Sequence, residues 1–121
     1  MDNENNIDHA DMVATLAKPG ETIAAELTGN DAHLLHMAVG VSGEAGELLD
    51  AIKKGAVYRK PYDRENIVEE LGDIEFYLEG LRQGLNITRE ETLNANIAKL
   101  GERYQGFKYS DQAAQDRADK Q

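Results

Sequence analysis

The sequence has no cysteine and no tryptophan, and aromatic residues make up only 6% of its 121 residues. The lack of cysteine excludes disulfides, thiol nucleophiles and zinc sites with cysteine ligands. Long hydrophobic runs are also missing, because no segment approaches the roughly 20 apolar residues that span a bilayer. The first twenty residues are polar and acidic, unlike the apolar stretch of a signal peptide. We therefore expect no membrane partner and a cytoplasmic location.

Positive charge is scarce as well. The chain has 23 Asp and Glu residues against 13 Lys and Arg residues, which gives a formal net charge of −10. A protein this acidic repels nucleic acids and anionic membranes, and we expect it to bind neither. A small polyanionic ligand is still compatible with this charge, provided that metal ions and locally placed cations accompany it.

Apolar residues repeat with helical spacing, and signals for strands are essentially absent. The sequence predicts an all-α fold with one domain at residues 9–109, between a disordered segment 1–8 and a polar tail 110–121. We expect helices at about 8–27 with a break at Pro19-Gly20, about 30–55 with Asn30 or Asp31 as N-cap, about 63–84 and about 88–103. Because such helices alone would leave apolar faces exposed, we expect an antiparallel helical bundle completed by self-association into a larger bundle.

Two stretches of the predicted second and third helical regions repeat each other 26 residues apart: Glu44-Ala45-Gly46-Glu47-Leu48 and Glu70-Leu71-Gly72-Asp73-Ile74. Residues three apart lie about 60° apart around a helix, so the two acids of each pair share a face. Both pairs border an apolar stripe, formed by Leu34, Ala38, Val41, Ala45, Leu48 and Ile52 in one helix and by Ile67, Leu71, Ile74, Leu78 and Leu81 in the other.

If the two helices pack stripe to stripe, four carboxylates converge: Glu44, Glu47, Glu70 and Asp73. Half-buried anions this close repel one another unless protons or cations lie among them. Mg²⁺ is the natural counter-ion, with Mn²⁺ as a substitute, because both prefer oxygen ligands. Glu-x-x-Glu is also common on solvated helix faces. The second copy in register, together with glycines at positions 40, 43, 46 and 72 that each cost a helix about 1 kcal/mol, favours a metal site.

Other polar side chains are candidates for substrate contacts. Asn96, Lys99 and Arg103 fall on one face of the last predicted helix, where they form either a phosphate clamp or ordinary solvated surface. His33 projects near the carboxylate edge, and Tyr77 lies one turn beyond Asp73. A surface histidine and a half-buried tyrosine are the structural alternatives for these two residues. Neither His33 nor His36, the two histidines of the helix at about 30–55, forms a Glu-x-x-His pair, so a ferritin-like di-iron site has no support.

Glu44-x-x-Glu47, Glu70-x-x-Asp73 and the following Asn/Lys/Arg face, in this order, resemble the MazG-like nucleotide pyrophosphohydrolases of the all-α NTP pyrophosphatase superfamily. The resemblance extends over about residues 31–109. Many members have an acid directly before the first motif, where this chain has Gly43, so the resemblance leaves the subfamily and the substrate open.

The resemblance implies a Mg²⁺-dependent hydrolase that cleaves a nucleoside or deoxynucleoside triphosphate to the monophosphate and pyrophosphate, in clearance of aberrant nucleotides or adjustment of the dNTP pool. The four acids would hold Mg²⁺, and Glu47 would accept the proton of the attacking water. Lys99 and Arg103 would stabilise the departing pyrophosphate. The alternative is a non-catalytic, metal-stabilised helical oligomerisation or interaction protein, which has no need of the cationic face.

Overall fold

The computed structural model describes residues 6–120, and these form helices and turns without a strand, which confirms the all-α prediction. The chain divides into two compact units, Met1–Ala32 and His33–Gln121. Within the described range, none of the helices has the length and apolar character needed to cross a membrane. The elements are α1 (His9–Leu16), α2 (Gly20–Glu26), α3 (Gly29–Ala56), α4 (Arg64–Leu85), α5 (Arg89–Arg103), η2 (Gln105–Phe107), α6 (Asp111–Asp116) and η3 (Ala118–Lys120).

The first unit contains two short helices, which begin where the sequence predicts. The backbone N–H of Ala10 donates to Asp8 Oδ1 at 2.9 Å and so caps α1. Pro19 immediately precedes α2, so the predicted break at Pro19-Gly20 is confirmed. The predicted disorder of segment 1–8 falls largely on residues 1–5, which lie outside the described residues.

The long helix α3 begins earlier than predicted, and its cap is a different residue. Thr28 Oγ1 accepts the backbone N–H of Asp31 at 3.0 Å, and Asp31 Oδ2 accepts the N–H of Thr28 at 3.0 Å. This reciprocal pair is a capping box, so the prediction of Asn30 or Asp31 as N-cap was wrong. The hydrogen bonds from Thr28 lower the pKa of the Asp31 carboxyl.

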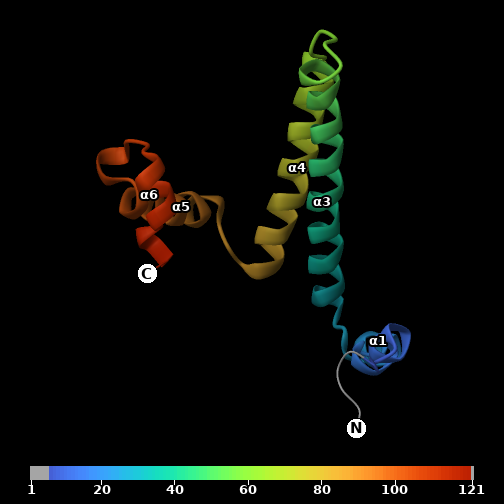
Figure 1. The fold of residues 1–121 in the computed structure, drawn as a ribbon. Coiled ribbons are helices and arrows are strands. Elements are labelled where there is room, and N and C mark those ends of the chain that lie inside the picture. Colours follow the sequence, from blue (N-terminus) through green and yellow to red (C-terminus); the bar gives the residue numbers. More distant parts are fainter. Residues whose placement is uncertain (1–5, 121) are drawn as a thin grey trace. The chain divides into compact units, whose positions relative to one another are not determined.

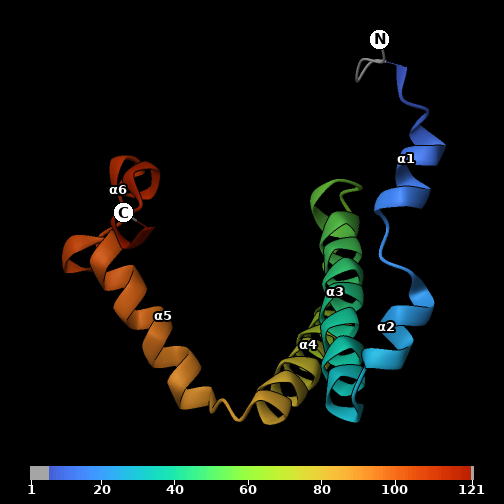
Figure 2. The ribbon, with the colours of Figure 1, turned by 90° about the horizontal axis from the view of Figure 1, so that it is seen from below.

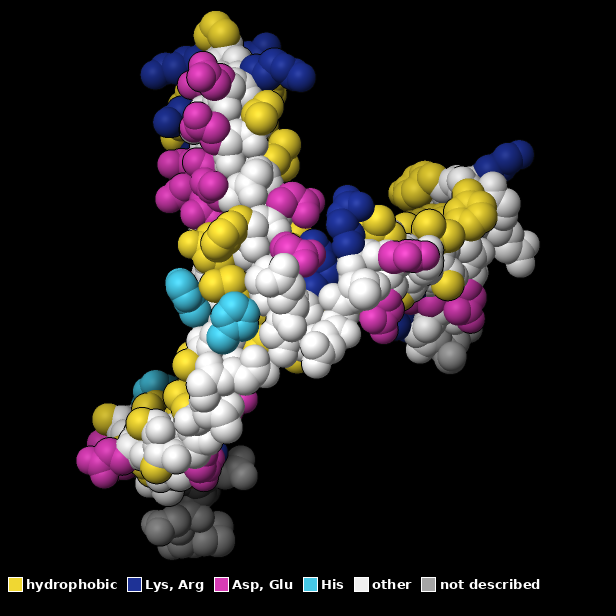
Figure 3. All heavy atoms as spheres, turned by 180° about the vertical axis from the view of Figure 1, so that it is seen from behind, with side chains coloured by type: hydrophobic (Ala, Val, Ile, Leu, Met, Phe, Trp, Pro, Cys, Tyr) yellow, Lys and Arg dark blue, Asp and Glu magenta, His cyan; other side chains and the backbone are white. Residues whose placement is uncertain are grey.

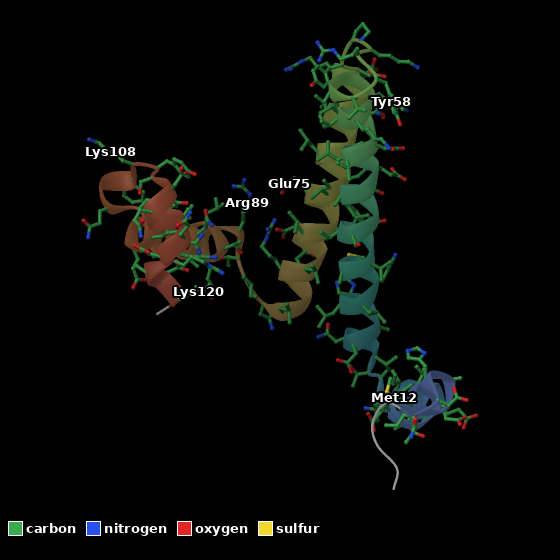
Figure 4. The ribbon with its side chains drawn as sticks, viewed as in Figure 1. Met12, Tyr58, Glu75, Arg89, Lys108 and Lys120 are labelled. Carbon is green, nitrogen blue, oxygen red and sulfur yellow. The ribbon has the colours of Figure 1, made fainter. Side chains whose placement is uncertain are left out.

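Helices α3 and α4 form an antiparallel hairpin and lie side by side in both ribbon views (Figure 1, Figure 2). A loop with Tyr58 at its start joins them at the tip (Figure 4). Asp63 caps α4 as predicted, because its Oδ1 accepts the N–H of Asn66 at 3.1 Å. At the other end Asn86 closes α4 in the left-handed conformation, with φ of 56°.

The contact between the two helices follows a heptad-like seam with alternating steps of three and four residues. Met37 and Ala51 are the buried hydrophobic residues, and each is 6% exposed. Four residues of the predicted stripes are exposed instead: Ala38, Ala45, Ile52 and Leu71. The stripes therefore identified the helices correctly, but at these positions the residue that faces the partner helix is the one immediately before the predicted residue. The buried and half-buried seam positions are Leu34, Met37, Val41, Glu44, Leu48, Ala51 and Gly55 on α3, and Ile67, Glu70, Ile74, Tyr77, Leu81 and Gly84 on α4.

Close approach of the helices depends on glycine at selected positions only. A Cβ at Gly40 would collide with the ring of Tyr77, and one at Gly80 would collide with Met37. By contrast, a Cβ at position 43, 46 or 72 would meet nothing within 4 Å in the described structure. Of the glycines at positions 40, 43, 46 and 72, Gly40 is therefore the one that a neighbouring side chain of the described structure approaches closely.

Gly40→Ala should lower the stability of the protein, whereas the matched change Gly43→Ala should not. Overpacking against Tyr77 costs about 1–3 kcal/mol and outweighs the gain of up to about 1 kcal/mol from replacing a helical glycine. Gly43→Ala keeps the gain without the clash, because its Cβ enters open space. Urea denaturation of both variants measures the difference, and equal midpoints would contradict the tight Gly40–Tyr77 packing.

The C-terminal part of the chain is helical beyond the predicted last helix. Thr88 caps α5 by accepting the N–H of Glu91 at 3.0 Å, as the capping-box pattern predicts. Ser110 caps α6 in the same way with the N–H of Ala113 at 3.0 Å. The segments η2, α6 and η3 all pack on α5. Residues 110–120 of the predicted polar tail therefore form part of a folded element.

Candidate metal centre

Three of the four predicted carboxylates converge in the α3–α4 hairpin. Glu44, Glu47 and Glu70 each place one oxygen so that all three atoms lie within 4.8 Å of one another. The antiparallel pairing that sets Tyr77 against Gly40 also brings the start of α4 beside the second half of α3. Figure 3 shows acidic side chains gathered along one edge of this hairpin, below the lysine and arginine side chains at its tip.

Two of these acids occupy seam positions that a heptad normally fills with apolar side chains. The prediction that both acid pairs lie at the border of the apolar stripe was wrong for Glu44 and Glu70, which are half-buried within the seam. The Oε2 atoms of Glu44 and Glu70 are buried without a hydrogen-bond partner. An unpartnered buried carboxylate oxygen is costly, so these positions favour a bound cation or a proton.

The proximity of the carboxyls changes the acidity of one of them. The Glu44 carboxyl raises the pKa of Glu70 to about 7, because a proton on Glu70 is shared with it, and burial and the charge of Glu47 act in the same direction. When both groups are ionised, neither offers a donor to the other, which explains the two unpartnered oxygens. A divalent cation fits this donor set, because hard cations bind carboxylate oxygens and replace the proton.

The fourth predicted ligand is not part of the convergence. Asp73 lies one turn beyond Glu70 on α4, is exposed, and is absent from the set of mutually close carboxylate oxygens in the described residues. Its role as a metal ligand therefore stays a prediction.

His33 and Tyr77 both contribute to helix packing. His33 Nε2 lies 2.8 Å from the carbonyl oxygen of Gly80, and we assign the proton to this nitrogen so that it donates. Tyr77 fits against Gly40 and meets the ring of Phe76 edge-on at a centroid distance of 5.2 Å. Both side chains are thus held in the hairpin by packing contacts, and their role in substrate binding stays a prediction. A cavity of about 370 Å³ beside them is lined by His33, Met37, Phe76, Glu79, Gly80 and Gln83.

The predicted cationic face lies on one continuous helix, since Asn96, Lys99 and Arg103 all belong to α5. Arg103 is already engaged in a two-pronged ion pair. Its Nε donates to Asp119 Oδ1 at 2.8 Å and its Nη2 donates to Oδ2 at 3.3 Å. The pairing raises the pKa of Arg103 and lowers the pKa of Asp119. Asp119 was not predicted as a partner of Arg103, because nothing in the spacing of a polar tail indicates which helix the tail packs against.

The raised pKa of Glu70 predicts that the metal-free protein loses stability as pH increases from about 4.5 to about 7. Over this window the unfolded chain releases the Glu70 proton while the folded protein retains it, so folding becomes less favourable. Mg²⁺ should therefore raise the melting temperature more above pH 7 than near pH 5. Thermal melts with EDTA and with Mg²⁺ across this range measure both effects.

Glu70→Gln should flatten this pH dependence and remove the response to Mg²⁺. The matched variant Glu69→Gln changes a neighbouring exposed acid outside the cluster and should retain both. A Mg²⁺ response that survives in Glu70→Gln would contradict a metal centre at these carboxylates.

Comparisons with known proteins bear directly on this carboxylate hairpin. The chain matches the MazG nucleotide pyrophosphohydrolase domain over residues 33–108, which is well over half of its length. Searches of curated proteins and of solved structures gave no match. The matched range includes the three converging carboxylates, the hairpin from residue 33 onward and the whole of α5. This chain therefore belongs to the MazG nucleotide pyrophosphohydrolase family.

Proposed function

We propose that this protein is a Mg²⁺-dependent hydrolase that cleaves nucleoside or deoxynucleoside triphosphates to the monophosphate and pyrophosphate. The observation that carries the proposal is the convergence of Glu44, Glu47 and Glu70 with two buried, unpartnered oxygens. Membership of a nucleotide pyrophosphohydrolase family supplies the reaction class. Cytoplasmic housecleaning of the nucleotide pool is the cellular role that we propose for it.

The three converging carboxylates would hold the metal, with Asp73 as the proposed fourth ligand. Bound Mg²⁺, or Mn²⁺ in its place, would neutralise phosphate charge and lower the pKa of a bound water. Glu44 and Glu70 are fixed in the seam by the packing of α3 on α4, so they are suited to a constant binding role. Glu47 is the exposed member of the three and retains access to solvent.

Glu47 is therefore the residue that we propose as proton acceptor. Its carboxylate would take a proton from water as the water oxygen attacks the α phosphorus in line. The bond from this phosphorus to the bridging oxygen then breaks, and pyrophosphate leaves with the electron pair. The monophosphate retains the new oxygen, so the reaction requires no other reactant.

The remaining substrate contacts are proposed from α5 and from the hairpin. Asn96, Lys99 and Arg103 would bind the phosphates, with Arg103 supplying a planar fork and Lys99 a point charge. We propose that His33 and Tyr77 meet the nucleoside part. His33 retains Nδ1 for such a contact, because its bond to Gly80 uses Nε2.

We propose that the protein acts as a homodimer or homotetramer. Large apolar side chains on the hairpin are exposed in the single chain, and a helical pair with two buried hydrophobic residues has little core of its own. The exposed residues include Leu35, Val39, Leu49, Val68 and Phe76. Analytical ultracentrifugation should detect an oligomer, and a monomer at high concentration would contradict this part of the proposal.

The competing function is a metal-stabilised helical oligomer without catalysis. Release of pyrophosphate and monophosphate from a panel of ribo-, deoxyribo- and modified nucleoside triphosphates, with Mg²⁺ and with EDTA, separates the two. Turnover that needs Mg²⁺ and produces both products supports the enzyme. Absence of turnover across the panel, with Mg²⁺ still raising the melting temperature, would favour the structural oligomer.

A further inference from the structure

The ion pair between Arg103 and Asp119 is a largely buried contact that joins α5 to the C-terminal segment. Both oxygen atoms of the Asp119 carboxylate accept hydrogen bonds from Arg103, at 2.8 and 3.3 Å. The Asp119 side chain is 5% exposed and that of Arg103 is 16% exposed. A long surface arginine normally samples many rotamers, whereas this one is held by a buried, two-pronged partner.

The geometry of the pair determines which part of the guanidinium remains available. An arginine side chain has five N–H donors, and Asp119 takes the edge formed by Nε and Nη2. Nη1 takes no part in this pair, and the second hydrogen of Nη2 is also outside it. The Tyr104 side chain also hydrogen-bonds with Arg103. The N–H donors left to bind phosphate oxygens are therefore those that neither Asp119 nor Tyr104 takes, while Asp119 fixes the plane of the guanidinium.

The surroundings of Arg103 are consistent with a ligand-facing edge. Arg103 lines a cavity of about 470 Å³ together with Lys108, Tyr109 and Gln112, and with the acids Glu102 and Asp116. The wall of this cavity is formed partly by α6 and by the residue that begins η3. Asp119 lies in η3, beyond the residues 33–108 that match the family domain. The carboxylate that holds Arg103 is thus supplied by a segment outside the matched domain.

We propose that Asp119 is a positioning residue, which orients the guanidinium of Arg103 toward the phosphates of the substrate. This inference rests on the proposed nucleotide pyrophosphohydrolase function. Residues 110–120 would then serve the active site through one carboxylate. Their packing on α5 holds that carboxylate in place, and Asp119 itself touches no substrate atom.

Steady-state kinetics of Asp119→Asn test this role. The amide keeps the shape of the carboxylate but cannot accept from Nε and Nη2 together, so kcat/KM should fall by about tenfold or more. Glu90→Gln removes one negative charge from an exposed position of α5 that does not line this cavity, and it should leave kcat/KM unchanged. Melting temperatures of both variants show whether the folded C-terminal segment is retained.

A rescue experiment separates positioning from a purely structural role. In Arg103→Ala, added guanidinium ion should restore part of the lost turnover, because Asp119 can hold the free cation where the side chain was. The same addition should fail in the double variant Arg103→Ala plus Asp119→Ala. Rescue that does not depend on Asp119, or an unchanged kcat/KM in Asp119→Asn, would overturn the proposal.

An increase of kcat/KM in Asp119→Asn would also overturn it, because Asp119 would then compete with phosphate for Arg103. If the wild-type protein hydrolyses no nucleotide in the panel, the proposed function itself fails, and the positioning role fails with it. Turnover by the wild type with unaltered kinetics in Asp119→Asn rejects the positioning role alone. The two failures are therefore distinguishable.

Discussion

Glu47→Gln should reduce nucleotide turnover by more than about 100-fold while leaving the protein folded. The amide keeps the size of the side chain but loses the negative charge that binds a cation and the basicity that accepts a proton. Because the Glu47 side chain is exposed, the substitution should disturb packing little. Product release measured at saturating Mg²⁺, beside a circular dichroism spectrum, tests both halves of the expectation.

Two further variants make this result specific. Glu70→Gln should lose turnover as well, yet the metal-free variant should be more stable than the wild type above pH 7, because a repelling charge leaves the seam. Glu69→Gln should keep both activity and stability, since this acid lies outside the converging set. Full turnover in Glu47→Gln would exclude this residue from the site. Loss of turnover in Glu69→Gln would show that turnover depends on the overall negative charge and not on the converging carboxylates.

The stability gain expected for Glu70→Gln follows from where the acids lie. A heptad seam between two helices is stabilised by apolar side chains, and Glu44 and Glu70 take two of those positions. Metal-free protein must therefore keep a proton among them or tolerate unpartnered oxygens. A departure of this kind from a local packing pattern is expected at a functional site, where a ligand relieves it.

The sequence predicted the acid cluster because two independent patterns agreed. The repeated acid spacing predicted the candidate ligands, and the apolar periodicity predicted the two helices that bring them together. The sequence did not predict which residues of α3 contact α4, because Met37 and Ala51 are as compatible with an apolar stripe as Ala38 and Ile52. Neighbouring residues of a helix point in directions 100° apart, so the position of the partner helix determines which of them is buried. A single sequence does not specify that position.

Helix N-caps were predicted correctly where a single candidate residue precedes the helix, and wrongly where several candidates lie close together. Thr88 and Asp63 stand alone before their helices, and both were predicted as helix starts. At α3 the residues Thr28, Asn30 and Asp31 all favour N-caps, and only the reciprocal bond between Thr28 and Asp31 distinguishes them. Asp119 is a different case, because its pairing with Arg103 joins residues far apart in the sequence.

Lys99→Glu should lower kcat/KM for a nucleoside triphosphate by about 100-fold, while the metal response of the melting temperature persists. Lys99 is proposed as a point charge on the phosphates, and reversal both removes an attraction and adds a repulsion to a protein of net charge −10. The helix itself should tolerate the change, since residue 99 is exposed on α5. The variant therefore separates phosphate binding from metal binding. A protein with a purely structural metal site would have no phosphate binding to lose.

Lys18→Glu is the matched control, because it changes the net charge by the same amount at an exposed site outside the family match. Its ion pair with Glu26 at 2.7 Å joins side chains that are 57% and 61% exposed, so its loss should cost little stability. A nucleotide that is merely repelled by a more acidic protein would respond equally to both variants, and added salt would restore both. A defect confined to Lys99→Glu and persisting at high salt assigns the effect to α5, where the charge of Lys99 also acts on Asp119. Equal activity of Lys99→Glu and wild type would exclude Lys99 from the phosphate site and leave the three carboxylates to be explained by metal binding alone.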